Sequence, residues 1–224
     1  MEELNVTERA HDHAVDAILR GSELSDLTAL YKPGVMLVTA PAPPNASALR
    51  HAEALMGAGL GQVASEVSTP DGAPKAGALK RLAVIDGDDA RAWVTYLEEV
   101  TTVFAHLLGS RAVGVRQVVS DGPHCPRFHV DRVVARGVLH VVGACTEWLD
   151  EADVDRSRLG HAGGPDDQTS GLVRNWARLA RAEPGTLAVF KGTAWPDAAD
   201  LAVVHRSPPA SGRRRIVVTL DLLV

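Results

Sequence analysis

The chain has 224 residues, of which 46% are hydrophobic and 23% are charged, and its formal net charge is −5 at pH 7. This length and balance are typical of one globular domain with a sizeable core. The acidic balance argues against a dedicated nucleic-acid-binding protein, and no apolar stretch reaches the roughly 18 residues that a membrane span needs.

Cysteine usage and the N-terminal residues bear on the compartment. Cys125 and Cys145 are too few for a disulfide framework and suit a reducing environment. Residues 1–21 are acidic and lack the basic-then-apolar pattern of a secretory signal. We therefore expect a cytoplasmic protein with a small-molecule substrate and no nucleic-acid or membrane partner; the oligomeric state stays open.

The first half of the chain is expected to be mainly helical. Apolar residues within 8–20 recur at helical spacing, and Asn45 is placed to cap a helix that runs through Met56. The strongest helix prediction covers Asp89–Leu108, where apolar side chains share one face and Gly109 ends the helix.

After this helix the apolar period becomes that of short strands. The segment 150–171, rich in Asp, Gly and Ser, is expected to be a loop and is a candidate lid, and residues 173–181 are a candidate short helix. Expected strands are residues 35–39, 111–119, 127–143, 186–191, 201–205 and 214–223.

Helices followed by many strands indicate an α+β protein with a mainly β core. We expect residues 1–110 to be a mainly helical N-terminal region, packed on one outer face of the core. Residues 111–224 are expected to form that core, and the two parts to make one structural domain.

The sharpest chemical signal is the motif F-H-V-D at residues 128–131. In a strand, side chains at i and i+2 point to the same face, so His129 and Asp131 are expected to project together. His205, in a distant predicted strand, is placed to supply a third ligand. Two histidines and one carboxylate form the facial triad that binds Fe(II) in non-haem oxygenases and leaves coordination positions open.

Arg215 follows His205 by ten residues, at the start of a strand whose two faces differ. The apolar face is expected to pack against helices, which leaves the other face to line the interior of the core. A guanidinium held there suits bidentate binding of a carboxylate, with Arg215 preferred over Arg213 or Arg214. The interior face carries Arg213, Arg215, Val217 and Thr219, and the apolar face carries Ile216, Val218, Leu220 and Leu222.

The pattern formed by His129, Asp131, His205 and Arg215 resembles that of the Fe(II)/2-oxoglutarate-dependent dioxygenase superfamily, and P-G-T-L-A-V-F-K-G at 184–192 is similar to a glycine-led strand of that fold. The resemblance implies a double-stranded β-helix, a jelly-roll or cupin-like fold. It also implies Fe(II) on the three ligands and O₂ as co-substrate. 2-Oxoglutarate would be held by Arg215, with Arg213 and Thr219 beside it.

Four motifs, CPRFHVDR, TEWL, KGTAWP and HRSPP, more narrowly resemble an uncharacterised bacterial domain family of unknown function. This likeness covers roughly residues 111–224, with a weaker likeness around Lys32–Val38. It brings no substrate with it.

Five residues near these motifs are candidates for the substrate pocket, although each could equally be an ordinary structural residue. Arg136 follows the H-x-D motif and would lie on the opposite face from His129 in a regular strand, unless a bulge near Asp131 changes the register. The others follow or precede predicted strands near the pocket. The five are Arg136, Glu147, Trp148, Lys191 and Trp195.

The function that these patterns predict is an Fe(II)- and 2-oxoglutarate-dependent oxygenase that hydroxylates or otherwise oxidises a small molecule. The same three ligands would also serve a cupin-like protein that holds Zn(II) or another divalent ion, as a hydrolase, an isomerase or a metal-handling protein. A non-catalytic binding module is the third alternative. Metal content and 2-oxoglutarate binding distinguish them.

Overall fold

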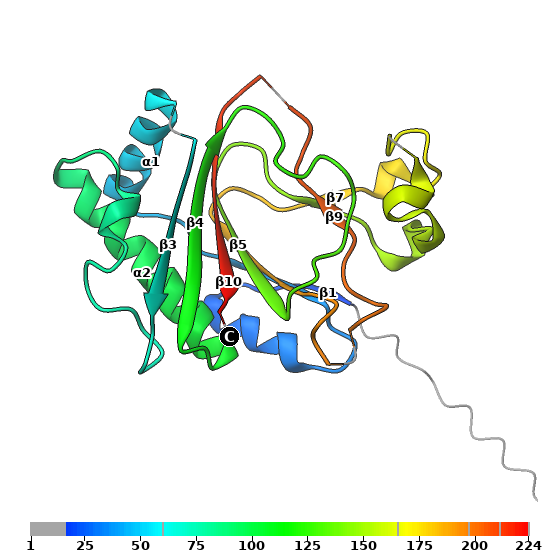
Figure 1. Cartoon of the computed structure of the whole chain (residues 1–224), viewed down its shortest axis with the longest axis horizontal. Helices are drawn as coiled ribbons and strands as arrows, with labels where there is room; N and C mark the ends of the chain where they lie inside the picture. The colour runs from blue at the N-terminus through cyan, green and yellow to red at the C-terminus, as the bar shows by residue number, and fades with distance from the viewer. Residues whose placement is uncertain (1–16, 60, 165, 197, 211, 224) are drawn as a thin grey trace, which may run out of the picture.

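The computed structural model describes residues 17–59, 61–164, 166–196, 198–210 and 212–223. It is an α+β structure built from a seven-stranded and a three-stranded sheet (Figure 1). Helices cover one face of the large sheet, and the small sheet lies toward its other face (Figure 1). Among the described residues, no helix combines the length and the apolar character needed to cross a bilayer.

The large sheet has the strand order β1-β2-β8-β5-β10-β4-β3. Its first pair is parallel and its other pairs are antiparallel. The strands are β1 (Ile18–Arg20), β2 (Leu37–Pro41), β3 (Gln62–Ser68), β4 (Ala112–Ser120), β5 (Ala135–Val142), β8 (Thr186–Lys191) and β10 (Arg215–Leu222).

The small sheet has the order β7-β6-β9 and is antiparallel. Side chains of both sheets meet in a second core that includes Trp148, Phe190 and Val217. The strands are β6 (Glu147–Trp148), β7 (Ala180–Arg181) and β9 (His205–Arg206). Short 3-10 turns complete the fold at η1 (Leu24–Tyr31), η2 (Lys80–Leu82), η3 (Glu151–Asp153), η4 (Arg156–Arg158), η5 (Gly160–Gly163) and η6 (Trp176–Arg178).

Two helices, α1 (Ala46–Ala58) and α2 (Asp88–Leu108), form the outer layer. The predicted cap of α1 is confirmed, because Asn45 Oδ1 accepts from the Ala48 amide at 2.9 Å. Gly109 ends α2 with a φ of 61°, a left-handed conformation that glycine adopts without strain.

Strand β10 shows the two faces that its sequence predicts. Ile216, Val218 and Leu220 are buried in the main core together with the apolar face of α2. Arg215, Val217 and Thr219 point to the other side and line a cavity between the sheets. Alternation along one strand therefore separates the packing residues from the candidate binding residues.

The N-terminal half is less helical than its pattern predicts. Residues 8–16 of the expected helix lie outside the described residues, and Ile18–Arg20 is strand β1, because its backbone pairs with β2. Strand β3 was not predicted. It is mostly exposed, and its pairing with β4 comes from a distant part of the chain. Long-range pairing thus overrides local preference here.

Three expectations in the second half also change. Of the predicted strand 201–205, only His205 lies in a strand, β9. Only Ala135–Val142 of the predicted strand 127–143 is a regular strand, and the metal motif lies in the irregular segment before it. The candidate helix 173–181 is a single 3-10 turn followed by β7.

A buried histidine makes stability depend on pH. His140 on β5 is 2% exposed, with Nε2 2.9 Å from Thr146 Oγ1. Burial lowers its pKa from 6.5 to about 4. Between these values the unfolded chain binds a proton and the folded chain does not, so stability is lost as pH falls through this window.

We expect this histidine to contribute about 3 kcal/mol of acid destabilisation between pH 7 and pH 4. Urea unfolding of metal-free protein, repeated across this range, measures it. The His140→Gln variant should show a correspondingly shallower pH dependence, and equal slopes in the two proteins would contradict the assignment.

Candidate metal centre

The structure brings His129, Asp131 and His205 together. One potential ligand atom from each lies within 4.8 Å of the others. His129 and His205 form an isolated antiparallel bridge, in which each amide donates to the other residue's carbonyl at 2.9 Å. Paired in this way, the two imidazoles project side by side, with ring centroids 4.6 Å apart.

Backbone carbonyls orient both rings. His129 Nδ1 lies 2.9 Å from the Arg127 carbonyl, and His205 Nδ1 lies 3.0 Å from the Val203 carbonyl. A carbonyl only accepts hydrogen bonds, so each Nδ1 must carry the proton. Each Nε2 is then left with a lone pair, which is the usual arrangement of a metal-binding histidine.

Asp131 is the anionic member of the group. Its two oxygens lie 3.8 Å from His129 Nε2 and 3.5 Å from His205 Nε2. Burial alone would raise its pKa, but the interaction with His205 and the charge of Arg136 lower the pKa to about 2. The carboxylate is therefore ionised at neutral pH.

The donor set fits a divalent transition metal. Asp131 Oδ2 is buried and has no hydrogen-bond partner among the described residues, which is costly for an anionic oxygen unless a cation binds it. Burial lowers the pKa of His129, which keeps this imidazole neutral. Two imidazole nitrogens and one carboxylate oxygen are ligands that Fe(II) and Zn(II) both accept.

Arg136 lies beside this group, not on the opposite face as a regular strand would place it. The chain turns between Asp131 and Ala135, so the side chain returns to the cavity side. Its guanidinium donates to Asp131 Oδ1 at 2.8 Å and to Asp221 Oδ1 at 2.6 Å. Arg136 thereby occupies one oxygen of Asp131 and leaves the other to a metal.

The K-G-T-A-W-P motif holds the backbone of the aspartate. The Thr193 amide donates to the Asp131 carbonyl, and the Gly192 amide donates to the Val134 carbonyl, both at 2.9 Å. A Cβ at Gly192 would lie 2.0 Å from the Val133 carbonyl oxygen. Only glycine permits this close approach.

Gly192→Ala is accordingly expected to lower the free energy of unfolding by about 1–3 kcal/mol, because a backbone atom must move to admit the methyl group. It should also weaken metal binding, since the displaced segment carries Asp131. Denaturant titration and Mn(II) titration measure the two effects. The control is Gly57→Ala in α1, where a Cβ meets nothing within 4 Å; unchanged stability of the Gly192 variant would refute the packing argument.

A cavity of about 170 Å³ opens beside the three ligands. Predicted residues Arg136, Arg215 and Thr219 line it, whereas Arg213 precedes β10, is exposed and lies outside the lining. Val217, expected on the same interior face, lines it as well. Sequence reasoning did not identify several other lining residues. They are Gln62, Arg116, Val118, His124, Cys125, Val138, Thr146, Arg206 and Ser207.

Glu147 and Trp148 do not line this cavity, although their position after β5 suggested it. Glu147 is buried and accepts from Arg206 Nε at 2.9 Å. Trp148 is 1% exposed and packs in the core between the sheets. Both residues therefore have structural roles outside the cavity lining.

Lys191 and Trp195 also lie outside the lining. Phe190 contacts the His205 ring with centroids 4.7 Å apart, so strand alternation directs Lys191 away from the metal group. Its Nζ lies 4.9 Å from the Trp195 ring, which in turn packs against Tyr31.

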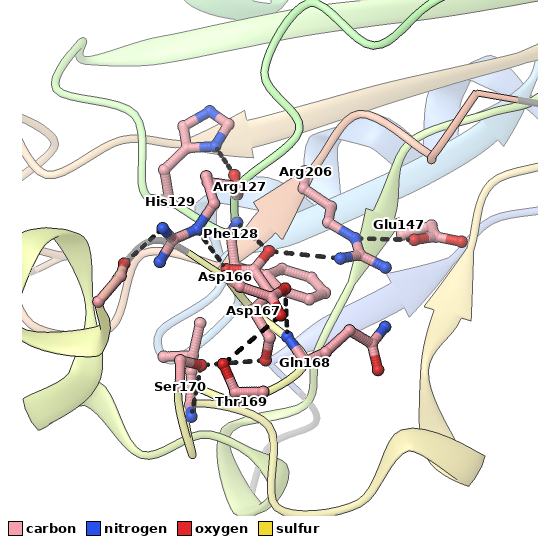
Figure 2. Close-up of polar contacts among 12 residues, drawn as sticks. Arg127, Phe128, His129, Glu147, Asp166, Asp167, Gln168, Thr169, Ser170 and Arg206 are labelled. Atoms are coloured by element: carbon pink, nitrogen blue, oxygen red, sulfur yellow. Dashed lines mark hydrogen bonds and ion pairs between the residues drawn. The ribbon is translucent and has the colours of Figure 1, made fainter.

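A buried ion network behind the metal group was also missed. Arg206, next to His205, donates to Glu147 and to Asp167 (Figure 2). Asp167 belongs to the predicted loop 150–171. No local sequence pattern predicts this role, because its partners lie 39 or 40 residues away in the sequence.

The two-sheet fold is similar to the folds of two solved dioxygenases. The dioxygenase for auxin oxidation 1 of Arabidopsis thaliana, solved with 2-oxoglutarate, has a TM-score of 0.54 and 10% identity, and the match covers 92% of this chain and 91% of that chain. The rice dioxygenase for auxin oxidation has a TM-score of 0.50 and 14% identity, with 92% and 82% covered. At these identities the likeness shows a shared fold.

The chain belongs to the family described as "Protein of unknown function (DUF1826)", whose model matches residues 21–221. The likeness to a family of unknown function, predicted from motifs within 111–224, is thus confirmed and extends through both helices. No curated protein matches the chain.

Proposed function

We propose that this protein is an Fe(II)- and 2-oxoglutarate-dependent oxygenase that oxidises a small molecule, with its two sheets as the halves of a double-stranded β-helix. The observation that carries the proposal is the clustering of His129, Asp131 and His205 beside one cavity, which the two histidines line together with Arg215. The 2-oxoglutarate complex of the Arabidopsis dioxygenase, which shares the fold, supports it.

Arg215 has the properties of a carboxylate anchor. It is 5% exposed, and its guanidinium donates a hydrogen bond to Ser207 Oγ at 3.1 Å. Among the described residues, no carboxylate forms an ion pair with it. Its burial away from water lowers its pKa. A buried guanidinium without a counter-charge is stabilised by an anionic ligand.

The division of labour follows from these positions. His129, Asp131 and His205 would hold Fe(II), which when bound supplies activation of O₂ and the oxidising chemistry. Arg215 would bind and orient the distal carboxylate of 2-oxoglutarate. Arg136 keeps Asp131 ionised and restricts it to one free oxygen, and the valines of the cavity wall exclude water from the reacting groups.

Anaerobic titration of the metal-free chain with Fe(II) and then with 2-oxoglutarate tests the proposal. We expect stoichiometric iron binding, a weak visible absorption band on addition of 2-oxoglutarate, and slow release of succinate once O₂ is admitted. Metal binding without the band or succinate would favour a zinc-type protein without oxygen chemistry. A chain that binds no divalent metal would overturn the proposal.

A further inference from the structure

The cavity is lined by more positive charges than binding of 2-oxoglutarate requires. Four arginines line it, Arg116, Arg136, Arg206 and Arg215, and its described lining contains no aspartate or glutamate. Arg136 and Arg206 are each paired with two carboxylates from outside the lining. With Arg215 assigned to 2-oxoglutarate, the remaining cation is Arg116.

Arg116 is oriented but only weakly paired. It lies on β4 opposite Thr219, whose Oγ1 accepts from its Nε at 3.2 Å. Among the described residues, its ion-pair partner is Asp221, whose carboxylate oxygen lies 3.9 Å from a terminal nitrogen of Arg116. That carboxylate already accepts from Arg136 at 2.6 Å. The side chain is 39% exposed, so a ligand can reach it.

The surroundings of Arg116 indicate the kind of ligand. Arg136 and Asp221 connect it to the metal ligand Asp131 along one wall of the cavity. Valine side chains and the amide of Gln62 complete the wall. We propose that Arg116 binds a carboxylate of the substrate to be oxidised, and that the substrate is a small molecule with an apolar body and one anionic end.

This inference rests on the proposed function, because it assumes that 2-oxoglutarate occupies Arg215. The test therefore uses the full chain loaded with Mn(II), which does not support turnover, and saturated with 2-oxoglutarate. Benzoate is the probe and benzamide its neutral match; calorimetric titration measures both.

We expect benzoate to bind and benzamide to bind at least about tenfold more weakly, the loss that a missing charge-assisted hydrogen bond produces. Arg116→Gln should weaken benzoate binding about tenfold and leave 2-oxoglutarate affinity within about twofold. The control is Arg111→Gln, at an exposed arginine before β4. No benzoate binding, equal binding of both probes, or an unaffected Arg116 variant would overturn the inference.

The two proposals fail separately. If 2-oxoglutarate does not bind but benzoate binding still depends on Arg116, the anion site stands and the oxygenase assignment falls. If 2-oxoglutarate binds and benzoate binding ignores Arg116, the oxygenase assignment stands and the substrate class is wrong.

An independent set of contacts assigns a role to Asp167. This carboxylate is 3% exposed and accepts from Arg127 Nε at 2.7 Å, from the Phe128 amide at 2.9 Å and from Arg206 at 3.3 Å. Figure 2 shows Asp167 with Arg127 and Phe128, the two residues before His129, and with Arg206, which follows His205 in the sequence. The buried Asp167 carboxylate therefore bonds to the segments that carry both histidines of the metal group.

The segment that carries Asp167 is itself anchored. Ser170 Oγ donates to the Asp167 carbonyl at 3.0 Å, and the Arg127 guanidinium also donates to the Gly164 carbonyl. The rings of Phe128 and Trp176 flank the Arg206 guanidinium at 4.4 and 5.3 Å. These contacts fix the segment in place beside the metal site.

We infer that Asp167 is a positioning residue for the metal site. The Arg127 carbonyl that sets the proton on His129 Nδ1 belongs to the residue whose side chain Asp167 holds. Losing the carboxylate charge should therefore loosen the histidine before any metal binds. This inference assumes that the three residues bind metal, but part of its test does not.

The test compares Asp167→Asn with Asp166→Asn, whose carboxylate accepts from Gln168 and Thr169 of its own turn. We expect the Asp167 variant to bind Mn(II) about tenfold more weakly, as losses around metal ligands typically do. In the metal-free chain, histidine ¹⁵N shifts should show one His129 tautomer in the parent and Asp166 variant, and a mixture in the Asp167 variant.

Equal metal affinity and an unchanged tautomer in the Asp167 variant would overturn the inference. If that variant does not fold, Arg127→Gln removes one of the three contacts at a more exposed side chain and is measured in the same way. It should show the same changes at smaller size, and a variant identical to the parent would again overturn the inference.

Discussion

His205→Ala is expected to weaken Fe(II) or Mn(II) binding by more than about 100-fold, since losing only an outer partner of a metal ligand costs 10- to 100-fold. The substitution removes one of three donors and leaves Asp131 with one neighbouring imidazole. The backbone bridge to His129 does not involve the side chain, so the fold should persist. Calorimetric metal titration of the metal-free protein measures the effect.

The matched control is His106→Ala. His106 is an exposed histidine in the last turn of α2, whose Nε2 lies 3.2 Å from the Asp71 carbonyl of a loop. Metal affinity of this variant should equal that of the parent. Near-parent affinity in the His205 variant would mean that the histidines are ordinary core residues and that no metal centre exists here.

Local sequence patterns predicted the elements that depend on local periodicity and missed those that depend on long-range pairing. Local patterns predicted α1, α2 and the two faces of β10, because the helical and strand periods report which side of an element is buried. They missed β1 and β3, whose identity depends on pairing with strands elsewhere in the chain. Backbone hydrogen bonds of this kind leave little trace in composition.

The candidate site divides in the same way. His129, Asp131, His205 and Arg215 follow a spacing that the sequence displays, and the structure gathers them. Asp167 has no spacing relation to them, because its contacts cross from another loop. Arg116 left a weak signal, since it interrupts the apolar run of β4 at an interior-facing position.

The irregular segment between Asp131 and Ala135 explains why Arg136 lies on the same side as the metal group. A continuous strand would have separated Arg136 from the metal group. The turn instead places it on the carboxylate, and Gly192 makes room for the turn. A departure from regular secondary structure is therefore what allows an arginine to set the protonation and the free oxygen of a metal ligand.

The second large effect is expected at Arg215. Arg215→Gln should weaken 2-oxoglutarate binding about 100-fold, because a bidentate contact between a buried guanidinium and a carboxylate contributes roughly 3 kcal/mol. Metal affinity should change by less than about twofold, since the Arg215 side chain bonds to Ser207 and not to His129, Asp131 or His205. Titration of the Mn(II)-loaded variant with 2-oxoglutarate measures the loss. Arg213→Gln, two residues earlier and exposed, is the control and should bind 2-oxoglutarate like the parent. If the Arg213 variant loses affinity and the Arg215 variant keeps it, the anchor lies outside the cavity, and the cosubstrate cannot share the space beside His129, Asp131 and His205.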